Sequence, residues 1–248
     1  MEPTTGPAAP APSFLPATPP AGTRSFASLL GLSMRRNGGR RSMSVIVVVL
    51  ALAGVSMVAF PALTDVFNKY QQAHVPDRLS DPGYQQLWRE HHIKVGQGLT
   101  RLVIDNDRVQ VNVLVVEGTT LAALEAGAGH YVDTPFPCEK GNVAIAGHRT
   151  TYGRPFNKLN YMHAGDTVDL VTPFARCTYR VIRPFDGHDN PWVVQPNSYS
   201  VVGQKGVLGT GHWLTLTSCN PLGSDAQRIV LRLRLDKVTP ITSKASSS

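Results

Sequence analysis

Residues 213–221, with the sequence WLTLTSCNP, read as a β-strand that delivers Cys219 to its C-terminal edge. Side chains along a strand point to opposite faces with a period of two. Leu214 and Leu216 therefore share a side that faces a core. The two threonines and Cys219 share the other side, which is expected to line a groove.

A second strand-like run, residues 228–235 (RIVLRLRL), begins nine residues after Cys219. Its apolar residues alternate with Arg228, Arg232 and Arg234, so this strand also has one core face and one polar face. A thiol at the end of one strand, with the guanidinium of Arg228 on the next, is the start of a nucleophilic site that still needs a base. We expect Arg232 and Arg234 to form a solvated strand face or part of the groove rim.

The base that fits best is His148, because a short apolar strand ends just before it and the imidazole can overhang a neighbouring strand end. Cysteine chemistry needs such a base, since the thiolate is the nucleophile. His212 lies on the same predicted strand as Cys219, on its opposite face and about 23 Å away. His163 and His188 lie in polar, turn-like contexts.

Three sequence blocks in this order resemble the sortases, in particular the class E sortases of actinobacteria. They are NVAIAGHRTTYG around His148, TLTSCNP around Cys219 and QRIVLRLRL from Gln227. With the block LEAGAGHYVDT at Leu124–Thr134, the resemblance covers most of residues 99–236. It implies a mainly β fold, an eight-stranded β-barrel with short helices, preceded by one transmembrane helix.

The resemblance also implies roles for individual residues. Cys219 would attack the threonine carbonyl of a sorting signal, and His148 would pass protons to and from the amines. Arg228 would stabilise the oxyanion or hold the substrate backbone. Tyr131 is similar to a class E tyrosine near the substrate groove, and Thr217, on the Cys219 face, could hydrogen-bond substrate. For these last two residues, simple packing and β-propensity are open alternatives.

The implied function is a membrane-anchored transpeptidase that cleaves an LPXTG-like signal after threonine, with LAXTG favoured in class E. The surface protein would pass to the amine of a peptidoglycan precursor (lipid II). A pilin-polymerising sortase and a catalytically weak, membrane-tethered binding protein on the same barrel are the alternatives. An L,D-transpeptidase is disfavoured because the chain lacks a Ser-His-Gly-x-Cys motif.

The chain departs from the family at several positions without losing a catalytic group. Ser218 stands where the family usually has a second threonine, and Asn220 where class E often has histidine. Val132 and Asp133 replace a common Pro-Gly pair. These departures bear on substrate preference and rate.

The N-terminal part divides into a tail and an anchor. Residues 1–43 are rich in Pro, Ala, Gly and Ser, which predicts a disordered tail, and end in an arginine cluster. Residues 44–64 are uncharged and apolar, about the ~20 residues that a membrane-spanning helix needs. A cleaved signal peptide has a shorter apolar region, and a core helix would be amphipathic. Arginines before the span place the N-terminus in the cytoplasm and the catalytic part outside the cell.

Beyond the anchor we expect a stalk or linker at 65–98, a catalytic barrel at 99–238 and a flexible tail at 239–248. In the stalk, Asp81-Pro82-Gly83 invites comparison with the lid motif of class C sortases, but the glycine favours a plain turn. A short helix is predicted at 120–126, with Thr119 as its cap. Strands are predicted at 100–106, 109–117, 142–146, 167–172, 178–184, 192–195, 214–218 and 228–235.

Charge and cysteine content limit which other functions are compatible with the sequence. Of the net charge of +7, five arginines and one glutamate precede the anchor, so the rest is nearly balanced and does not indicate a nucleic-acid-binding protein. No Cys-x-x-Cys pair or His-Glu-x-x-His helix occurs, so neither a metal nor another cofactor is expected. Cys138 and Cys177 remain beside Cys219, and an exported domain permits a disulfide between them. The sequence leaves open whether they pair or stay as two free thiols.

Overall fold

The computed structural model describes residues 26–74, 78–184, 187–203 and 210–241. The chain divides into two compact units, and the boundary along the sequence lies between Val55 and Ser56 of the first helix. The helices are α1 (Phe26–His74), α2 (Pro82–Arg89) and α3 (Leu121–Ala126), with short 3₁₀ turns η1 (Arg78–Ser80), η2 (Leu159–Tyr161) and η3 (Tyr199–Val201).

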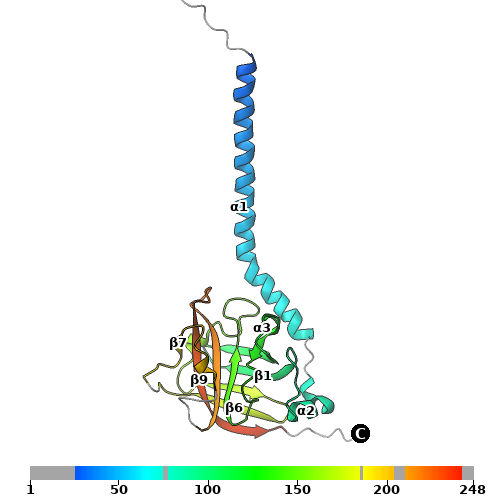
Figure 1. Ribbon diagram of the computed structural model, residues 1–248, viewed down its shortest axis with the longest axis vertical. Helices are drawn as coiled ribbons and strands as arrows, with labels where there is room; N and C mark the ends of the chain where they lie inside the picture. Colours follow the sequence, from blue (N-terminus) through cyan, green and yellow to red (C-terminus); the bar gives the residue numbers. More distant parts are fainter. Residues whose placement is uncertain (1–25, 75–77, 185–186, 204–209, 242–248) are drawn as a thin grey trace, which may run out of the picture. The chain divides into compact units, whose positions relative to one another are not determined.

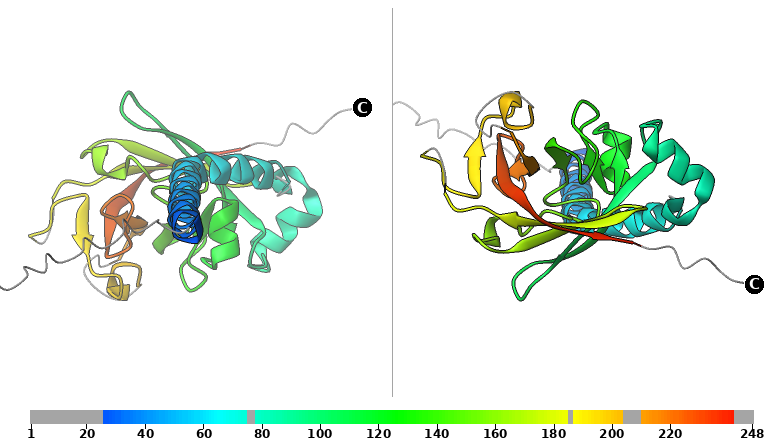
Figure 2. Two further views of the ribbon diagram at one scale, coloured as in Figure 1. Left: turned by 90° about the horizontal axis from the view of Figure 1, so that it is seen from above. Right: turned by 90° about the horizontal axis from the view of Figure 1, so that it is seen from below.

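Strands of the described chain form one sheet that closes on itself (Figure 1). Their bounds are β1 (Gly98–Asp105), β2 (Gln110–Glu117), β3 (Ala128–His130), β4 (Gly141–Ala146), β5 (Thr167–Val171), β6 (Ala175–Val181), β7 (Trp192–Val194), β8 (His212–Asn220) and β9 (Gln227–Pro240). The ring runs β6-β5-β1-β2-β3-β4-β8-β9 and is closed by the pairing of β9 with β6. The expected eight-stranded barrel is therefore confirmed. In Figure 2, β7, drawn in yellow, lies beside β9 outside the ring.

The barrel interior is filled by the apolar face of every long strand. Leu214 and Leu216 of β8 and Ile229, Leu231 and Leu233 of β9 all belong to one buried core cluster. Each is between 0% and 4% exposed. The alternation predicted from the sequence is thus confirmed for both strands, and it leaves the Cys219 face pointing away from the core.

The polar face of β9 differs from expectation. Arg232 is 4% exposed, so the prediction of a solvated arginine there is wrong. Its Nη2 donates to Val201 O at 2.7 Å, and its backbone N–H donates to Asn190 Oδ1 at 3.0 Å. Burial lowers the pKa of Arg232 to about 10. The segment around β7 and η3 therefore covers this face of the sheet, while Arg234 is exposed.

The structure differs from the secondary structure predicted from the sequence at three places. β3 was not expected, because Ala-Gly-His is short and lacks a β-branched residue. Thr120, not Thr119, caps α3 by accepting a hydrogen bond from Ala123 N. Asp81-Pro82 is not a plain turn: Asp81 caps α2 through Tyr84 N at 2.8 Å, and proline occupies the first helical turn, where it is tolerated.

α1 contains the predicted anchor. Within it, Met43–Ala73 is the part of the described chain long and apolar enough to cross a membrane. Its apolar side chains are exposed, from Val45 at 61% to Leu63 at 67%. The helix begins at Phe26, so residues 26–43 are helical where a disordered tail was expected, because extending an existing helix is easier than starting one. Residues 1–25 of that tail lie outside the described residues, as do those beyond Ile241.

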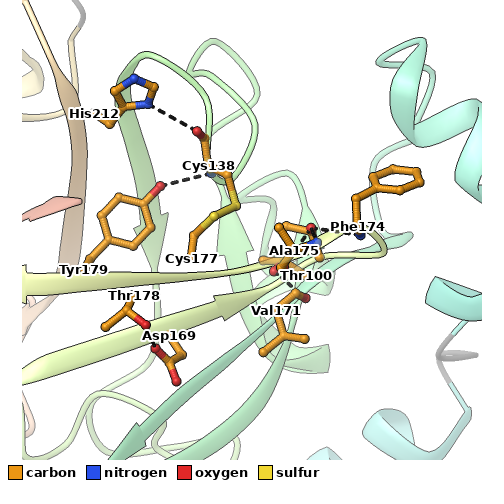
Figure 3. The surroundings of a disulfide bond; sticks show 11 residues. Thr100, Cys138, Asp169, Val171, Phe174, Ala175, Cys177, Thr178, Tyr179 and His212 are labelled. Carbon is orange, nitrogen blue, oxygen red and sulfur yellow. Dashed lines mark hydrogen bonds between the residues drawn. A yellow bond between two sulfur atoms is a disulfide. The ribbon is translucent and has the colours of Figure 1, made fainter. Parts of the chain in front are cut away.

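Cys138 and Cys177 form a disulfide with Cα atoms 5.7 Å apart, which answers the question that the sequence left open. Figure 3 shows its surroundings. The Tyr179 hydroxyl accepts a hydrogen bond from Cys138 N at 3.0 Å, and His212 Nδ1 lies 3.2 Å from Cys138 O. Burial raises the pKa of Tyr179 to about 12. The disulfide ties the loop before β4 to the middle of the β5–β6 pair.

Candidate active site

β8 and β9 bring Cys219 and Arg228 together. The two strands are antiparallel, and Cys219 is the register partner of Arg228. Cys219 is a free cysteine of intermediate exposure. The thiol therefore lies at a strand end that solvent can reach, with the guanidinium residue directly across the ladder.

β4 brings His148 to the same end of the barrel. It runs parallel to β8, with Ala146 opposite Thr217. The ladder continues beyond the strand, because Gly147 N donates to Thr217 O at 3.1 Å and Ser218 Oγ donates to Gly147 O at 2.7 Å. His148 follows Gly147 in the sequence, and Cys219 follows Ser218. The two residues therefore follow the last paired positions of β4 and β8, at the same end of the barrel.

Gly147 permits this approach. A Cβ atom at this position would lie 2.6 Å from the Phe156 ring, which is closer than atoms can pack. Phe156 is 1% exposed and belongs to the barrel core. Its backbone N–H donates to His148 O at 3.2 Å. The absence of a side chain at Gly147 therefore lets the chain pass close over the core at the residue before His148.

The His148 imidazole is partly covered. Its Nε2 is buried and has no hydrogen-bond partner within the described residues. Its ring centroid lies 5.0 Å from that of Tyr152. Burial lowers the pKa of His148 below its ordinary value, and the charge of Glu125 partly opposes that shift. A neutral imidazole with a nitrogen free of protein bonds can accept a proton.

The Arg228 guanidinium is held at the turn between β8 and β9. Its Nη1 donates to Asp225 O at 2.7 Å and to Gln227 O at 2.8 Å. These are neutral backbone acceptors, so these two bonds leave the positive charge of the guanidinium intact. For Nη1 to donate to a substrate carbonyl, the side chain would have to break its hydrogen bonds to Asp225 O and Gln227 O.

Tyr131 and Thr217, the two predicted substrate residues, contact each other. The Tyr131 hydroxyl lies 3.1 Å from Thr217 Oγ1. Tyr131 follows β3, whose His130 is fully buried between Glu117 Oε2 and Pro135 O, at 2.9 Å each. The histidine of the LEAGAGHYVDT block is thus a structural group that holds the adjacent tyrosine next to β8.

Sequence reasoning missed Arg149. This residue is 5% exposed, and its Nη1 donates to Cys219 O at 3.2 Å and to Asn220 Oδ1 at 2.6 Å. Its Nη2 donates to Asn160 Oδ1 at 3.0 Å. The guanidinium therefore ties the segment after β4 to the end of β8. Its position next to His148 was the available signal, but nothing local in the sequence predicts its burial.

The two departures in the Cys219 block are both hydrogen-bonded. Ser218 is buried and binds Gly147 O, as described above. Asn220 accepts from Arg149 and donates through Nδ2 to Gln227 Oε1 at 3.1 Å. Among the described residues, no group of three or more His, Cys, Asp or Glu side chains could hold a metal ion.

Comparisons with known proteins agree with this geometry. Residues 104–236 match the family model described as a sortase domain. Sortase SrtE1 of Streptomyces coelicolor is 28% identical over 225 residues, which span 83% of this chain and 62% of that protein. Sortase E from Streptomyces avermitilis is 31% identical, with a TM-score of 0.51, over 59% of this chain and 93% of that one. Sortase E1 from Streptomyces coelicolor, solved with a tripeptide in the active site, is 29% identical, with a TM-score of 0.51 over 58% and 91%.

Proposed function

Because the chain belongs to the sortase family of cysteine transpeptidases, we propose that it cleaves a C-terminal sorting signal after threonine and transfers the surface protein to a peptidoglycan-precursor amine. One observation carries this proposal. Cys219 pairs in register with Arg228 and stands one residue beyond the Ser218–Gly147 hydrogen bond that leads to His148.

The first half-reaction is acylation. His148, kept neutral near pH 7 by its lowered pKa, accepts the Cys219 thiol proton. The sulfur then attacks the threonine carbonyl carbon, and Arg228 stabilises the oxyanion that develops. The threonine–glycine C–N bond breaks, and His148 returns its proton to the glycine amine. The product is a thioester between Cys219 and the surface protein.

The second half-reaction returns the enzyme to its starting state. The acceptor amine attacks the thioester carbonyl and loses a proton to His148. The new amide forms as the C–S bond breaks, and the Cys219 sulfur regains the proton. The reaction exchanges one amide for another, so it needs no external energy source. Water competes with the amine for the same thioester.

For the donor we propose an LAXTG signal within the LPXTG-like class. This choice follows the class E resemblance, and we propose that the Tyr131 and Thr217 hydroxyls, which lie 3.1 Å apart, contact the bound signal. A sortase E1 of known structure holds a tripeptide in its active site. We propose lipid II as the acceptor from the family resemblance.

For the location we propose a single-pass membrane protein with residues 44–64 as the span. The exposed apolar residues of α1 support this placement. The arginines before the span support a cytoplasmic N-terminus, and the disulfide between Cys138 and Cys177 supports an oxidising, extracellular location for the catalytic barrel. The barrel, from about residue 99, follows a juxtamembrane segment at 65–98.

The test uses the full chain in detergent micelles. Quenched peptides containing Leu-Ala-x-Thr-Gly or Leu-Pro-x-Thr-Gly are incubated with the protein and an amine acceptor, alongside the Cys219→Ala variant. We expect cleavage and a transpeptidation product from the wild type, faster with the alanine peptide, and neither from the variant. Equal turnover by both proteins, or none by either, would overturn the proposal.

A further inference from the structure

The last part of α1, residues 64–72, contacts the barrel through polar side chains. Thr64, Asn68 and Gln72 lie four residues apart, so they share one face of the helix. Thr64 is 7% exposed and Asn68 6%. Val66, on another face, is 66% exposed. This is the reverse of an ordinary surface helix. The Thr64 hydroxyl donates within the helix, to Pro61 O, so the hydrogen bonds to the barrel come from the residues that follow it.

One set of these bonds reaches α3 and β2. Asn68 Nδ2 donates to Glu125 O at 2.9 Å. Leu114 N donates to Gln72 Oε1 at 3.0 Å, and Gln72 Nε2 donates to Ala126 O. From Ser56 onward the helix belongs to the same compact unit as the barrel. The segment is thus docked on the catalytic domain.

A second set reaches the loop that follows His148. Asp65 accepts a hydrogen bond from Gly153 N at 3.0 Å and forms an ion pair with Arg154 at 2.6 Å. The Phe67 ring meets the Tyr152 ring edge-on, with centroids 6.3 Å apart. Three successive loop residues therefore contact α1.

Those same three residues have an unusual backbone. Tyr152, Gly153 and Arg154 have φ values of +51°, +75° and +48°. The left-handed region is unfavourable for residues with a Cβ atom, and such conformations persist where the surroundings hold them. A Cβ atom on Gly153 would lie 2.3 Å from Asn68 Oδ1. The loop conformation is therefore fitted to the docked helix.

The loop connects this contact to the imidazole. The Tyr152 ring lies 5.0 Å from the His148 ring, and interaction with the Glu125 carboxylate raises the pKa of the Tyr152 hydroxyl. Glu125 is also the residue whose carbonyl accepts from Asn68. Tyr152, whose ring lies against His148, and Glu125, whose charge acts on it, thus both contact α1.

We propose that residues 64–72 of α1 are a positioning element of the active site, which holds His148 in place through Tyr152 and Glu125. This inference rests on the proposed role of His148 in proton transfer. The segment touches neither substrate nor sulfur. Its release from the barrel would slow proton transfer while leaving the affinity for the sorting signal nearly unchanged.

The first experiment compares matched variants of the full chain in micelles. Asn68→Ala and Asp65→Asn remove docking bonds, whereas Val66→Ala changes an exposed residue of the same helix. We expect kcat to fall about tenfold in the two docking variants, as slight misplacement of a catalytic group does. KM should stay within about twofold of the wild type, since ground-state binding is not touched. Wild-type kcat in both docking variants would overturn the proposal.

The pH dependence of kcat/KM separates positioning from a general loss of folding. Tyr152→Ala uncovers the imidazole, so the midpoint of the acidic limb should rise. Glu125→Gln removes the nearby negative charge, so the midpoint should fall. Partial unfolding would lower the amplitude and leave both midpoints unchanged. Unchanged midpoints, or two shifts in the same direction, would count against the proposal.

A third experiment measures the dynamics of the loop and does not depend on catalytic activity. Amide hydrogen exchange of peptides covering residues 148–158 should be faster in Asn68→Ala and unchanged in Val66→Ala. If the wild type cleaves no sorting peptide, the proposed function fails, and the exchange result still decides whether α1 holds the loop. If the wild type is active and exchange is equal in all three proteins, the positioning role alone fails.

Discussion

A cysteine and a histidine lie near each end of β8, but the two pairs are in different chemical states. At its start, His212 is bonded to the carbonyl of Cys138, whose sulfur is joined to Cys177. At its end, Cys219 is a free thiol, and His148 Nε2 has no hydrogen bond within the described residues. The same residue types therefore form a structural contact at one end and, at the other, the pair that we propose to be reactive. The two pairs differ in whether the sulfur and the imidazole are already bonded to other groups of the protein.

The histidines offer the largest test of this contrast. His148→Ala should lower kcat/KM by about 10²–10⁴, because it removes the general acid and base. His212→Ala should leave kcat/KM within about twofold, since a hydrogen bond remote from the chemistry alters stability instead. Peptide cleavage assays on both variants make the comparison. Similar losses in both would show that the two ends are not functionally distinct.

The cysteines test the opposite property. Replacing Cys138 and Cys177 together by alanine should lower the free energy of unfolding by about 2–5 kcal/mol, as loss of a native disulfide does. Activity below the unfolding temperature should remain. Cys219→Ala should abolish activity while changing the free energy of unfolding little. Urea unfolding and peptide cleavage are measured on both proteins, and a large stability loss in Cys219→Ala would contradict the assignment.

A smaller effect is expected in the pH dependence of activity and stability, through the ionisation of His148. Burial lowers the pKa of His148 below 6.5, so the acidic limb of kcat/KM should have its midpoint below that value. The unfolded chain takes up this proton at the ordinary pKa, so protonation favours unfolding, and the His148 contribution to stability is lost as the pH falls below 6.5. A pH–rate profile of the wild type measures the midpoint. A midpoint above 6.5 would show that a nearby negative charge dominates over burial.

The smallest predicted effect is at the edge of the reactive end. Tyr131→Phe removes the hydroxyl that lies 3.1 Å from Thr217 Oγ1. We expect kcat/KM to fall about fivefold, the equivalent of one hydrogen bond, with the loss larger for the alanine-containing peptide than for the proline one. Tyr199→Phe, at a residue that is 74% exposed, is the matched control. Equal effects on both peptides would remove Tyr131 from substrate selection.

Much of the barrel could be predicted from alternation, because β8 and β9 each bury one apolar face. Which strands form the closed barrel could not be predicted in this way. The eight predicted strands include β7, which lies outside the ring, and omit β3, which is inside it. A three-residue strand rich in small residues has no period to detect, and its place depends on β2 and β4 on either side.

The predictable part of the active site was the pair of adjacent strands with Cys219 and Arg228, where a single turn brings register partners together. Burial of Arg149 and Arg232 could not be predicted. Arg149 is enclosed by bonds to residues 11 and 71 positions away. Arg232 is covered by η3 and its neighbours, 31 positions away. Periodicity assigns a side chain to a face, but only tertiary structure decides what covers that face.

The parallel pairing of β4 with β8 also has a consequence for how the protein becomes reactive. The partners Ala146 and Thr217 are far apart in the chain, and contacts between distant residues form slowly because a long loop must close first. A partly synthesised chain that ends before β8 contains His148 but not Cys219. Cys219 and His148, the base that we propose for it, therefore reach the same end of the barrel only after β8 has been synthesised and has paired with β4.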